Sequence, residues 1–286
     1  MSESILRFEN VTLSFDDKVA LDNVSLEVKS GETFILFGAA GSGKTVLLKL
    51  AMGLLRPDSG KIFLLGQEIT QMKEVNLLDL RSDVGILFQE GGLFDSQTIE
   101  ENVSYPLLNQ KRLAAPPEEV AQRVKESLEF VELGHTLDKF PSELSGGMRR
   151  RVGIARASVT NPKLLLYDSP TAGLDPITAH TIMSLIVKQR DMRKTTTVLA
   201  SHRYQDGSMA ANYKWDESLR DVTRVLPYGQ YADLNTVFVV MNEGKIAFQG
   251  TQQELESSRD PYVSQFVLHQ PPPILKHRSD GGHLQA

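Results

Sequence analysis

The spacing of apolar positions predicts that strands come first in this chain and that strands and helices alternate afterwards. Residues 5–28 alternate in part between apolar and polar side chains, as strands with one buried face do, and residues 24–28 alternate cleanly. Asp16 and Asp17 offer a turn between them. We therefore expect a small antiparallel sheet that leads into a buried strand at residues 33–37, where most side chains are apolar.

Beyond this strand the pattern is typical of an α/β fold. Apolar positions recur at helical spacing after residue 45, and no proline interrupts them before Pro57. Strands alternating with helices indicate a largely parallel sheet, and residues from about 90 to 160 predict an inserted helical region. The further predicted strands are 61–65, 84–88, 163–168, 196–200 and 237–241, and the clearest further helices are 118–133 and 177–188.

The turn after the buried strand has the sequence of a phosphate-binding loop. Its glycines let backbone N–H groups close around phosphates, and the helix N-terminus adds a partial positive charge. Lys44 can reach the β- and γ-phosphates, and the Thr45 hydroxyl can bind Mg²⁺. An ordinary glycine-rich turn with a surface lysine is the alternative, which the flanking strand and helix disfavour. The predicted nucleotide contacts are Gly38, Ala39, Ala40, Gly41, Ser42, Gly43, Lys44 and Thr45.

Three further polar side chains stand where predicted strands end. Gln89 can bind Mg²⁺ or hold the attacking water, and Asp168 is placed to hold the metal's water shell or Thr45. His202 arrives where the γ-phosphate should lie. The plainer interpretations are a solvent-facing loop glutamine and a structural histidine, so these two assignments depend on the rest of the pattern.

A second anion site is predicted at Ser145, Gly146 and Gly147, because a Ser-Gly-Gly entry to a helix exposes several N–H groups. The arginines that follow, residues 149–151, are equally compatible with a solvated helix face. The motif is weak evidence alone and strong evidence together with an upstream phosphate loop. Phe15 precedes that loop and could stack on an adenine base, with a plain core position as the alternative.

Composition excludes several classes of function. The 286 residues include no cysteine, so a disulfide framework and a thiolate metal site are both impossible. The net charge of −5 argues against non-specific nucleic-acid binding. The first ten residues do not resemble a signal peptide, and no apolar run approaches the roughly 18 residues that cross a bilayer. If the protein acts at a membrane, we expect a partner to hold it there.

Taken together, the motifs resemble the nucleotide-binding subunits of ATP-binding-cassette (ABC) transporters over about residues 4–255. The phosphate loop, Gln89, residues 144–148, Asp168, residues 172–175 and His202 occur in that family's order and spacing. The resemblance implies a P-loop NTPase fold with a RecA-like mixed sheet core, an N-terminal antiparallel β subdomain and an inserted α-helical subdomain.

Within the family, the chain looks like the ATPases of mammalian-cell-entry (MCE) type lipid transporters, which move phospholipid between envelope membranes. This narrower resemblance is carried by residues 86–94, 102–107, 142–148 and 259–266. It implies a nucleotide-binding domain over 1–255, with its helical subdomain at about 90–160. Residues 256–286 would form a C-terminal extension and flexible tail, in which Phe266 and Leu268 would anchor a clasp on the other subunit.

The resemblance also implies a head-to-tail homodimer. Each ATP would lie between the phosphate loop of one subunit and residues 145–147 and Asp175 of the other, with Mg²⁺ held by Thr45, Gln89 and Asp168. The other implied partners are an integral membrane permease, a small regulatory subunit and an MCE substrate-binding protein, and no nucleic acid. The expected location is peripheral, at the cytoplasmic face of the inner membrane.

Two departures from the family pattern stand out. The family normally has a catalytic glutamate directly after Asp168, and this chain has Ser169. A neutral hydroxyl is no base at pH 7, and losing a general base costs about 10²–10⁴-fold in rate. Slow hydrolysis assisted by His202 and Gln89, a regulatory site and an engineered trap all fit. The second departure is an insertion at about 204–231, aromatic and without a clear period, which fits a partner contact or a plain surface loop.

The sequence thus leaves competing functions. The leading hypothesis is an ATPase that drives a lipid-transporting membrane complex. A second hypothesis is a nucleotide-gated scaffold that does not hydrolyse ATP, and Ser169 in place of a catalytic glutamate is compatible with it. A soluble ABC protein acting on DNA or ribosomes is less favoured, because such proteins usually carry two cassettes or a long coiled coil.

Overall fold

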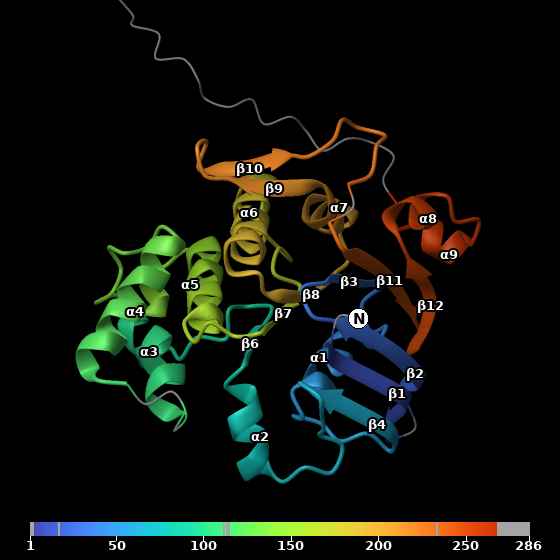
Figure 1. Ribbon diagram of the computed structural model, residues 1–286, viewed down its shortest axis with the longest axis horizontal. Coiled ribbons are helices and arrows are strands. Elements are labelled where there is room, and N and C mark those ends of the chain that lie inside the picture. Colours follow the sequence, from blue (N-terminus) through green and yellow to red (C-terminus); the bar gives the residue numbers. More distant parts are fainter. Residues whose placement is uncertain (1–2, 17, 111, 113–114, 233, 268–286) are drawn as a thin grey trace, which may run out of the picture.

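The computed structural model describes residues 3–267 except 17, 111, 113, 114 and 233, and its strands form three sheets (Figure 1). The strands are β1 Ser4–Phe15, β2 Lys18–Lys29, β3 Thr33–Gly38, β4 Ser59–Leu64, β5 Gln67–Glu68, β6 Val84–Leu87, β7 Leu164–Asp168, β8 Thr196–Ser201, β9 Tyr213–Asp216, β10 Asp221–Arg224, β11 Thr236–Asn242 and β12 Lys245–Gly250. The helices are α1 Lys44–Ala51, α2 Glu74–Arg81, α3 Ile99–Asn109, α4 Pro117–Phe130, the 3₁₀ helix η2 Pro141–Glu143, α5 Gly146–Ser158, α6 Pro176–Arg193, α7 Tyr204–Asn212, α8 Gln252–Glu256 and α9 Pro261–Ser264.

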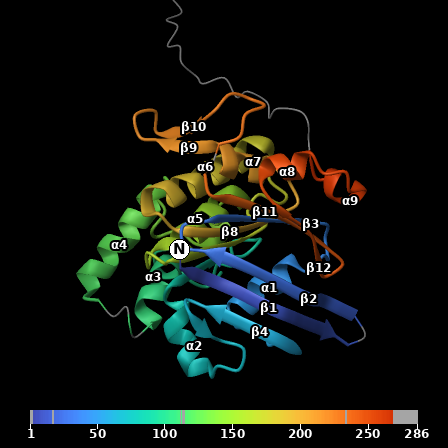
Figure 2. The same cartoon turned by 45° about the vertical axis from the view of Figure 1, so that its right-hand side comes forward.

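The central sheet is six-stranded, in the order β12-β11-β3-β8-β7-β6, and every pair is parallel except β11 with β12. Alternate residues of β3 enter different cores. Ile35 and Phe37 pack with the cluster that includes α5, α6 and α7, and Phe34 and Leu36 pack with the cluster of α1 and the first strands. Figure 2 shows the sheet between these layers. Burial on both faces explains why β3 and β7 read as nearly continuous apolar runs, and all six residues of β8 are buried as well.

The first strands form a separate antiparallel sheet in the order β2-β1-β4-β5. Its buried face is built from alternating side chains such as Leu6, Phe8 and Val24, as strands with one wet face require. The predicted α/β fold with a mixed central sheet and an N-terminal antiparallel sheet is therefore confirmed.

Helices α3, α4 and α5 lie beside the edge strand β6 (Figure 1). Thr98 begins α3 with a capping box, accepting from the Glu101 amide at 3.2 Å while the Glu101 carboxylate accepts from the Thr98 amide at 2.7 Å. Pro117 begins α4 at a position where its missing N–H costs nothing. Among the helices described, none has both the length and the apolar character that crossing a bilayer requires.

The segment 204–231 is more ordered than its sequence pattern suggested. Helix α7 follows β8 directly and packs on the central sheet, where a Cβ on Gly207 would lie 2.6 Å from the Phe37 ring. Strands β9 and β10 then form an antiparallel hairpin over α6 (Figure 1). The part of the segment that stands outside the central layers is therefore the hairpin and the loop after it.

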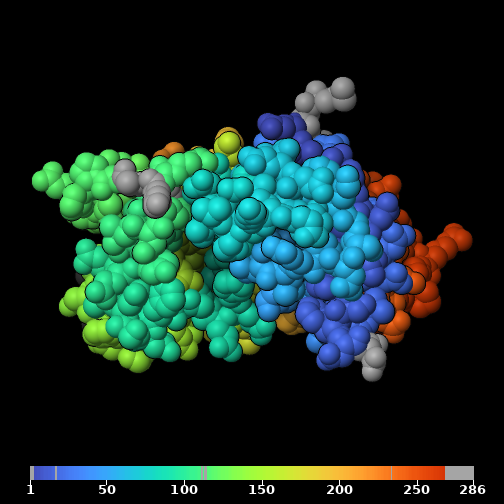
Figure 3. Space-filling model, turned by 90° about the horizontal axis from the view of Figure 1, so that it is seen from below, coloured from blue at the N-terminus to red at the C-terminus, as the bar shows by residue number. Residues whose placement is uncertain are grey.

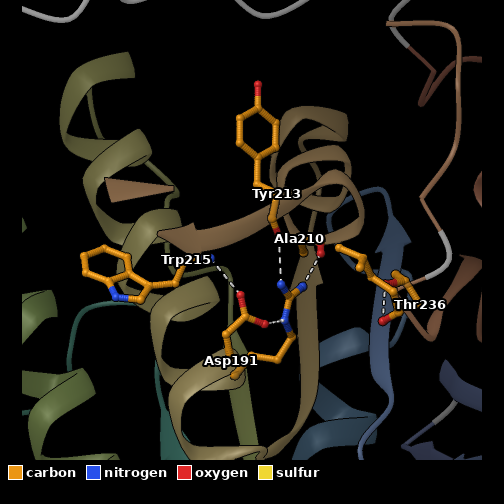
Figure 4. A network of polar contacts seen from close by, with 7 residues as sticks. Asp191, Ala210, Tyr213, Trp215 and Thr236 are labelled. Atoms are coloured by element: carbon orange, nitrogen blue, oxygen red, sulfur yellow. Dashed lines mark hydrogen bonds and ion pairs between the residues drawn. The ribbon is translucent and has the colours of Figure 1, made fainter. Parts of the chain in front are cut away.

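Polar side chains of α6 hold this hairpin in place through hydrogen bonds (Figure 4). The buried guanidinium of Arg190 donates to the carbonyl of Ala210 and, at 2.8 Å, to that of Tyr213. Asp191 accepts from the amide of Trp215 at 2.8 Å. These contacts satisfy backbone groups at the end of α7 and the start of β9, which explains how a sequence without clear periodicity is held in place.

The C-terminal helices pack on the same chain. The Phe266 ring lies parallel to that of Phe37, with centroids 6.5 Å apart, and against Tyr262 at 5.3 Å. Phe266, expected to anchor a clasp on another subunit, thus has partners within its own chain. Leu268 and the predicted tail to residue 286 lie outside the described residues.

A glycine in β6 generates the first prediction. A Cβ on Gly85 would lie 2.0 Å from the carbonyl oxygen of Ala157 in α5, and a backbone atom cannot rotate away. We expect Gly85→Ala to lower the free energy of unfolding by about 1–3 kcal/mol through overpacking, measured by chemical denaturation. Gly146→Ala is the matched control, because its Cβ would have no neighbour closer than 3.9 Å. Equal stability of the two variants would contradict this packing.

Candidate nucleotide-binding site

Most of the sequence-predicted site residues gather at one edge of the central sheet. Strands β3, β8, β7 and β6 are neighbours and parallel, so their carboxyl ends meet at the same edge. These four ends lead in turn to the phosphate loop, His202, Asp168 and Gln89. In an open parallel sheet this edge is where ligands bind.

The phosphate loop connects β3 to α1 and needs its glycines for close approach. A Cβ on Gly38 would lie 2.3 Å from Ser42 Oγ and 2.6 Å from the carbonyl oxygen of Met241. Gly43 has a φ of +104° and approaches the carbonyl oxygen of Ala20, which would be 2.7 Å from an added Cβ. The loop is therefore wrapped between β11 and β2, and α1 begins directly after it with its N-terminus free to face an anion.

Lys44 folds over this loop. Its Nζ donates to the carbonyls of Gly38 at 2.7 Å and Ala39 at 2.8 Å. Burial lowers the pKa of the Lys44 ammonium, and the negative charge of Asp168 opposes that shift. The ammonium is thus desolvated among carbonyls with Asp168 as a counter-charge, and the phosphates of a nucleotide would supply further negative charge.

Thr45 and Asp168 form the part of the site that suits a metal ion. The Thr45 hydroxyl donates to both carboxylate oxygens of Asp168, at 3.1 and 2.9 Å. Among the described residues no three acidic, histidine or cysteine side chains converge. One hydroxyl and one carboxylate nevertheless fit Mg²⁺, which takes oxygen ligands and usually keeps several from water and substrate phosphates.

The fold holds the remaining predicted catalytic residues in different ways; these are Ser169, Gln89 and His202. Ser169 has a left-handed φ of 49°, its amide donates to the carbonyl of Ala200 at 2.9 Å, and its hydroxyl lies 3.5 Å from Asp168. Gln89 and His202 are exposed beyond the ends of β6 and β8. Their side chains are therefore accessible to a bound phosphate or water.

Residues 145–147 lie at another part of the fold than the phosphate loop of the same chain. Ser145 caps α5, and its hydroxyl accepts from the amide of Met148 at 3.3 Å. Helix α5 packs on β6, which is three strand spacings from β3, or about 14 Å. Within the described residues, the fold therefore does not bring Ser145 to its own phosphate loop.

Asp175 and Phe15 complete the predicted set. Asp175 caps α6, accepting from the amides of Ile177 and Thr178 at 3.0 Å, and the hydrogen bonds from Thr178 lower its pKa. Phe15 ends β1 and is 46% exposed, so its ring is free to stack. Strand β2, its partner in the hairpin, contacts the phosphate loop at Gly43.

Sequence reasoning missed two residues that support the site. Asp206 is buried, accepts from the hydroxyls of Thr171 at 2.5 Å and Ser201 at 2.6 Å, and has its pKa raised by burial. It ties the loop after β7 to the end of β8. The Tyr262 hydroxyl donates to the Met241 carbonyl at 3.0 Å and accepts from the phosphate-loop amide of Ala39 at 3.4 Å. Nothing local in the sequence signalled either residue, because α7 mixes polar and apolar residues and Tyr262 lies far along the chain from Ala39.

A glycine-lined loop of this geometry, between a parallel strand and a helix and beside a hydroxyl–carboxylate pair, defines a P-loop nucleoside triphosphatase. Residues 21–172 match the family described as ABC transporter, and the chain belongs to that family. ATPases of this family bind and hydrolyse ATP.

One of the two relatives compared matches nearly the whole chain, and the other matches about two thirds of it. The intermembrane phospholipid transport system ATP-binding protein MlaF of Haemophilus influenzae is 34% identical over 98% of this chain and 94% of its own length. The methionine import ATP-binding protein MetN of Carboxydothermus hydrogenoformans is 44% identical, over 64% of this chain and 53% of its own length.

Solved structures share the fold. The dimeric ATP-binding cassette MJ0796, in a post-hydrolysis state bound to ADP and Pi, has a TM-score of 0.73 at 28% identity, covering 86% of this chain and 98% of that one. The protein cbiO1 of Clostridium perfringens, part of the transporter complex cbiONQ, has a TM-score of 0.72 at 28% identity, covering 92% and 98%.

The contacts of Lys44 predict its importance for nucleotide binding. We expect Lys44→Ala to weaken ATP binding at least about tenfold, because the phosphates lose a charged hydrogen-bond donor. Titration with a fluorescent ATP analogue in the presence of Mg²⁺ measures the change. Lys49→Ala removes an exposed lysine from the same helix and should bind normally. Tight binding by the Lys44 variant would contradict the assignment of the phosphate loop.

Proposed function

We propose that this chain is the ATP-binding, energy-coupling subunit of an ABC transporter that moves phospholipid between envelope membranes. The observation that carries the proposal is the similarity to MlaF, which extends over 98% of this chain and 94% of the relative. Methionine import ATP-binding proteins are also similar: two are 42–44% identical but are covered over only 53% of their length, and others are 34–37% identical and are covered over 67–77%. We weigh the longer match more heavily, because nucleotide-binding motifs serve every member of the family alike.

In this proposal two copies of the chain form a head-to-tail dimer around two ATP molecules. The support is geometric, because residues 145–147 lie at the far edge of the sheet from the phosphate loop of their own chain. A second copy can bring its own residues 145–147, with Asp175, to that loop. The similar cassette MJ0796 is described as a dimer. Closing and reopening this dimer would be the two-state motion that drives a membrane partner.

The face that carries α2 and α3 fits such a partner. It exposes large apolar side chains, with Val75 at 66% and Leu78 at 53% on α2, and Tyr105 at 40% and Leu108 at 65% on α3. Figure 3 shows this face hollowed between its cyan and green parts. Exposed apolar patches beside a hollow are typical of protein interfaces. We propose that a helix of an integral membrane permease docks here and holds the chain at the cytoplasmic face of the inner membrane.

The proposed complex would also include a small regulatory subunit and an MCE substrate-binding protein. Within the ATPase, Mg²⁺ supplies charge stabilisation for phosphoryl transfer when bound with ATP. Thr45 and Asp168 would hold the ion, and Lys44 would bind the β- and γ-phosphates. Gln89 and His202 would orient water at the γ-phosphate. Because Ser169 supplies no base, we propose that the chemical step is slow.

Purification of the native complex tests whether the transported molecule is a phospholipid. We expect a tagged chain, extracted from membranes, to bring down an integral membrane protein with bound phospholipid, identified by mass spectrometry. Leu108→Asp should lose the membrane protein by placing a charge on the docking face. Met192→Asp changes a residue that is similarly exposed, 51%, but lies on α6, and should retain it.

Other outcomes would identify other functions. ATP turnover stimulated by methionine and a partner without bound lipid would favour the methionine import relatives instead. Recovery of the chain with no membrane protein would favour a soluble ABC protein that does not transport.

Ser169 generates a separate prediction. If this position lacks the base, Ser169→Glu should raise ATP turnover by about 10²–10⁴-fold, measured by phosphate release. Ser169→Ala is the matched control, because it removes the hydroxyl without adding a carboxylate and should leave the slow rate nearly unchanged. A wild type that already turns over as fast as Ser169→Glu would show that another group acts as base. Tight ATP binding with no turnover in the wild type would favour a nucleotide-gated scaffold.

A further inference from the structure

One buried arginine joins three segments of the nucleotide site. Arg150 lies on α5 and is 8% exposed. Its Nε donates to the carbonyl of Gln89 at 2.8 Å, and its Nη2 donates to the carbonyl of Ala172 at 2.5 Å. The side chain therefore ties the helix that begins at residues 145–147 to the loop after β6 and to the loop between β7 and α6.

The backbone of α5 and the backbone of the loop after β6 also approach each other closely. A Cβ on Gly153 of α5 would lie 3.1 Å from the carbonyl oxygen of Gly91, and a Cβ on Gly91 would lie 3.1 Å from that of Arg149. Arg156 donates to the Gly91 carbonyl at 2.9 Å. Backbones in such close contact cannot slide independently, so α5 and this loop form one rigid unit.

The first turn of α6 contacts the same helix at a second point. A Cβ on Gly147 would lie 2.4 Å from Cγ2 of Thr178, and the Thr178 hydroxyl donates to Asp175 at 2.5 Å. The loop that follows Asp168 therefore touches α5 at Arg150 through Ala172, and the first turn of α6, which follows that loop, touches α5 at its N-terminus. The orientation of residues 145–147 is set by both contacts.

The chemistry of arginine makes this link stiff. Burial lowers the pKa of the Arg150 guanidinium, with the charge of Glu90 opposing the shift, but the group remains protonated in a protein. A buried cation without hydrogen-bond partners is costly. The planar fork directs its donors at fixed angles, so separating α5 from either loop would leave a buried donor unpaired.

We propose that Arg150 is a positioning residue that couples the two nucleotide sites of the dimer. This inference rests on the proposed function, in which residues 145–147 of one subunit close on the nucleotide held by the other. Gln89 faces the nucleotide of its own subunit, whereas residues 145–147 and Asp175, at the end of the loop that holds Ala172, serve the partner's nucleotide. A rigid link between them passes a shift at one site to the other, and such coupling is reciprocal.

The experiment uses the full chain with Mg²⁺ and a non-hydrolysable ATP analogue. We expect Arg150→Gln to weaken nucleotide-driven dimerisation, measured by analytical ultracentrifugation, by about tenfold or more. Affinity for a fluorescent ATP analogue, measured at chain concentrations too low for dimers, should stay at the wild-type value. The Hill coefficient for nucleotide binding at high chain concentration should fall toward that of independent sites. Arg150→Lys, which keeps the charge but not the fork, should recover part of the loss.

Arg190→Gln is the matched control for lost stability. Arg190 is equally buried, at 8%, and also donates to two backbone carbonyls, but those belong to Ala210 and Tyr213, in α7 and β9. We expect it to lower the melting temperature without changing dimerisation. Equal loss of dimerisation in both variants, or none in Arg150→Gln, would overturn the inference alone. A wild type that stays monomeric with nucleotide would instead contradict the proposed dimer, and this inference with it.

Discussion

The hydrogen bonds from the Thr45 hydroxyl to the Asp168 carboxylate join two strand ends that are not neighbours in the sheet. Strand β8 lies between β3 and β7, so the contact forms above the carboxyl edge, where α1 begins and β7 ends. This pair fixes the place at which a metal ion and the phosphates can meet. Gln89 and His202 lie at the same edge, because β8 runs between β3 and β7 and β6 is the neighbour of β7.

The electrostatics of the site are asymmetric. Lys44 is desolvated among carbonyls, which lowers its pKa and leaves it poised for an anionic ligand. On the opposite side Asp168 is buried and already paired with Thr45. Ser169 adds no charge beside them. The arrangement therefore provides positive charge for the phosphates of a nucleotide and, at Ser169, no carboxylate that could take a proton from water.

Several contacts reach the site from segments distant in the sequence. Asp206 clamps Thr171 and Ser201, and Tyr262 reaches the amide of Ala39 from a C-terminal helix. Sequence patterns did not reveal these roles, since each depends on a single side chain meeting a partner that only the fold brings near. For the same reason the sequence did not predict a regular structure for residues 204–231. Arg190 holds that segment through contacts that leave no local periodicity in the sequence.

The sequence by itself determined the phosphate loop, the residues at the four strand ends and the α/β class. These depend on local chemistry: glycines that permit close approach, apolar runs that require burial on both faces, and polar side chains directly after them. The tertiary structure alone decided that residues 145–147 lie beyond reach of their own phosphate loop, and that Arg150 binds two separate loops. Strand order and helix packing set those distances, and both arise from contacts between residues far apart along the chain.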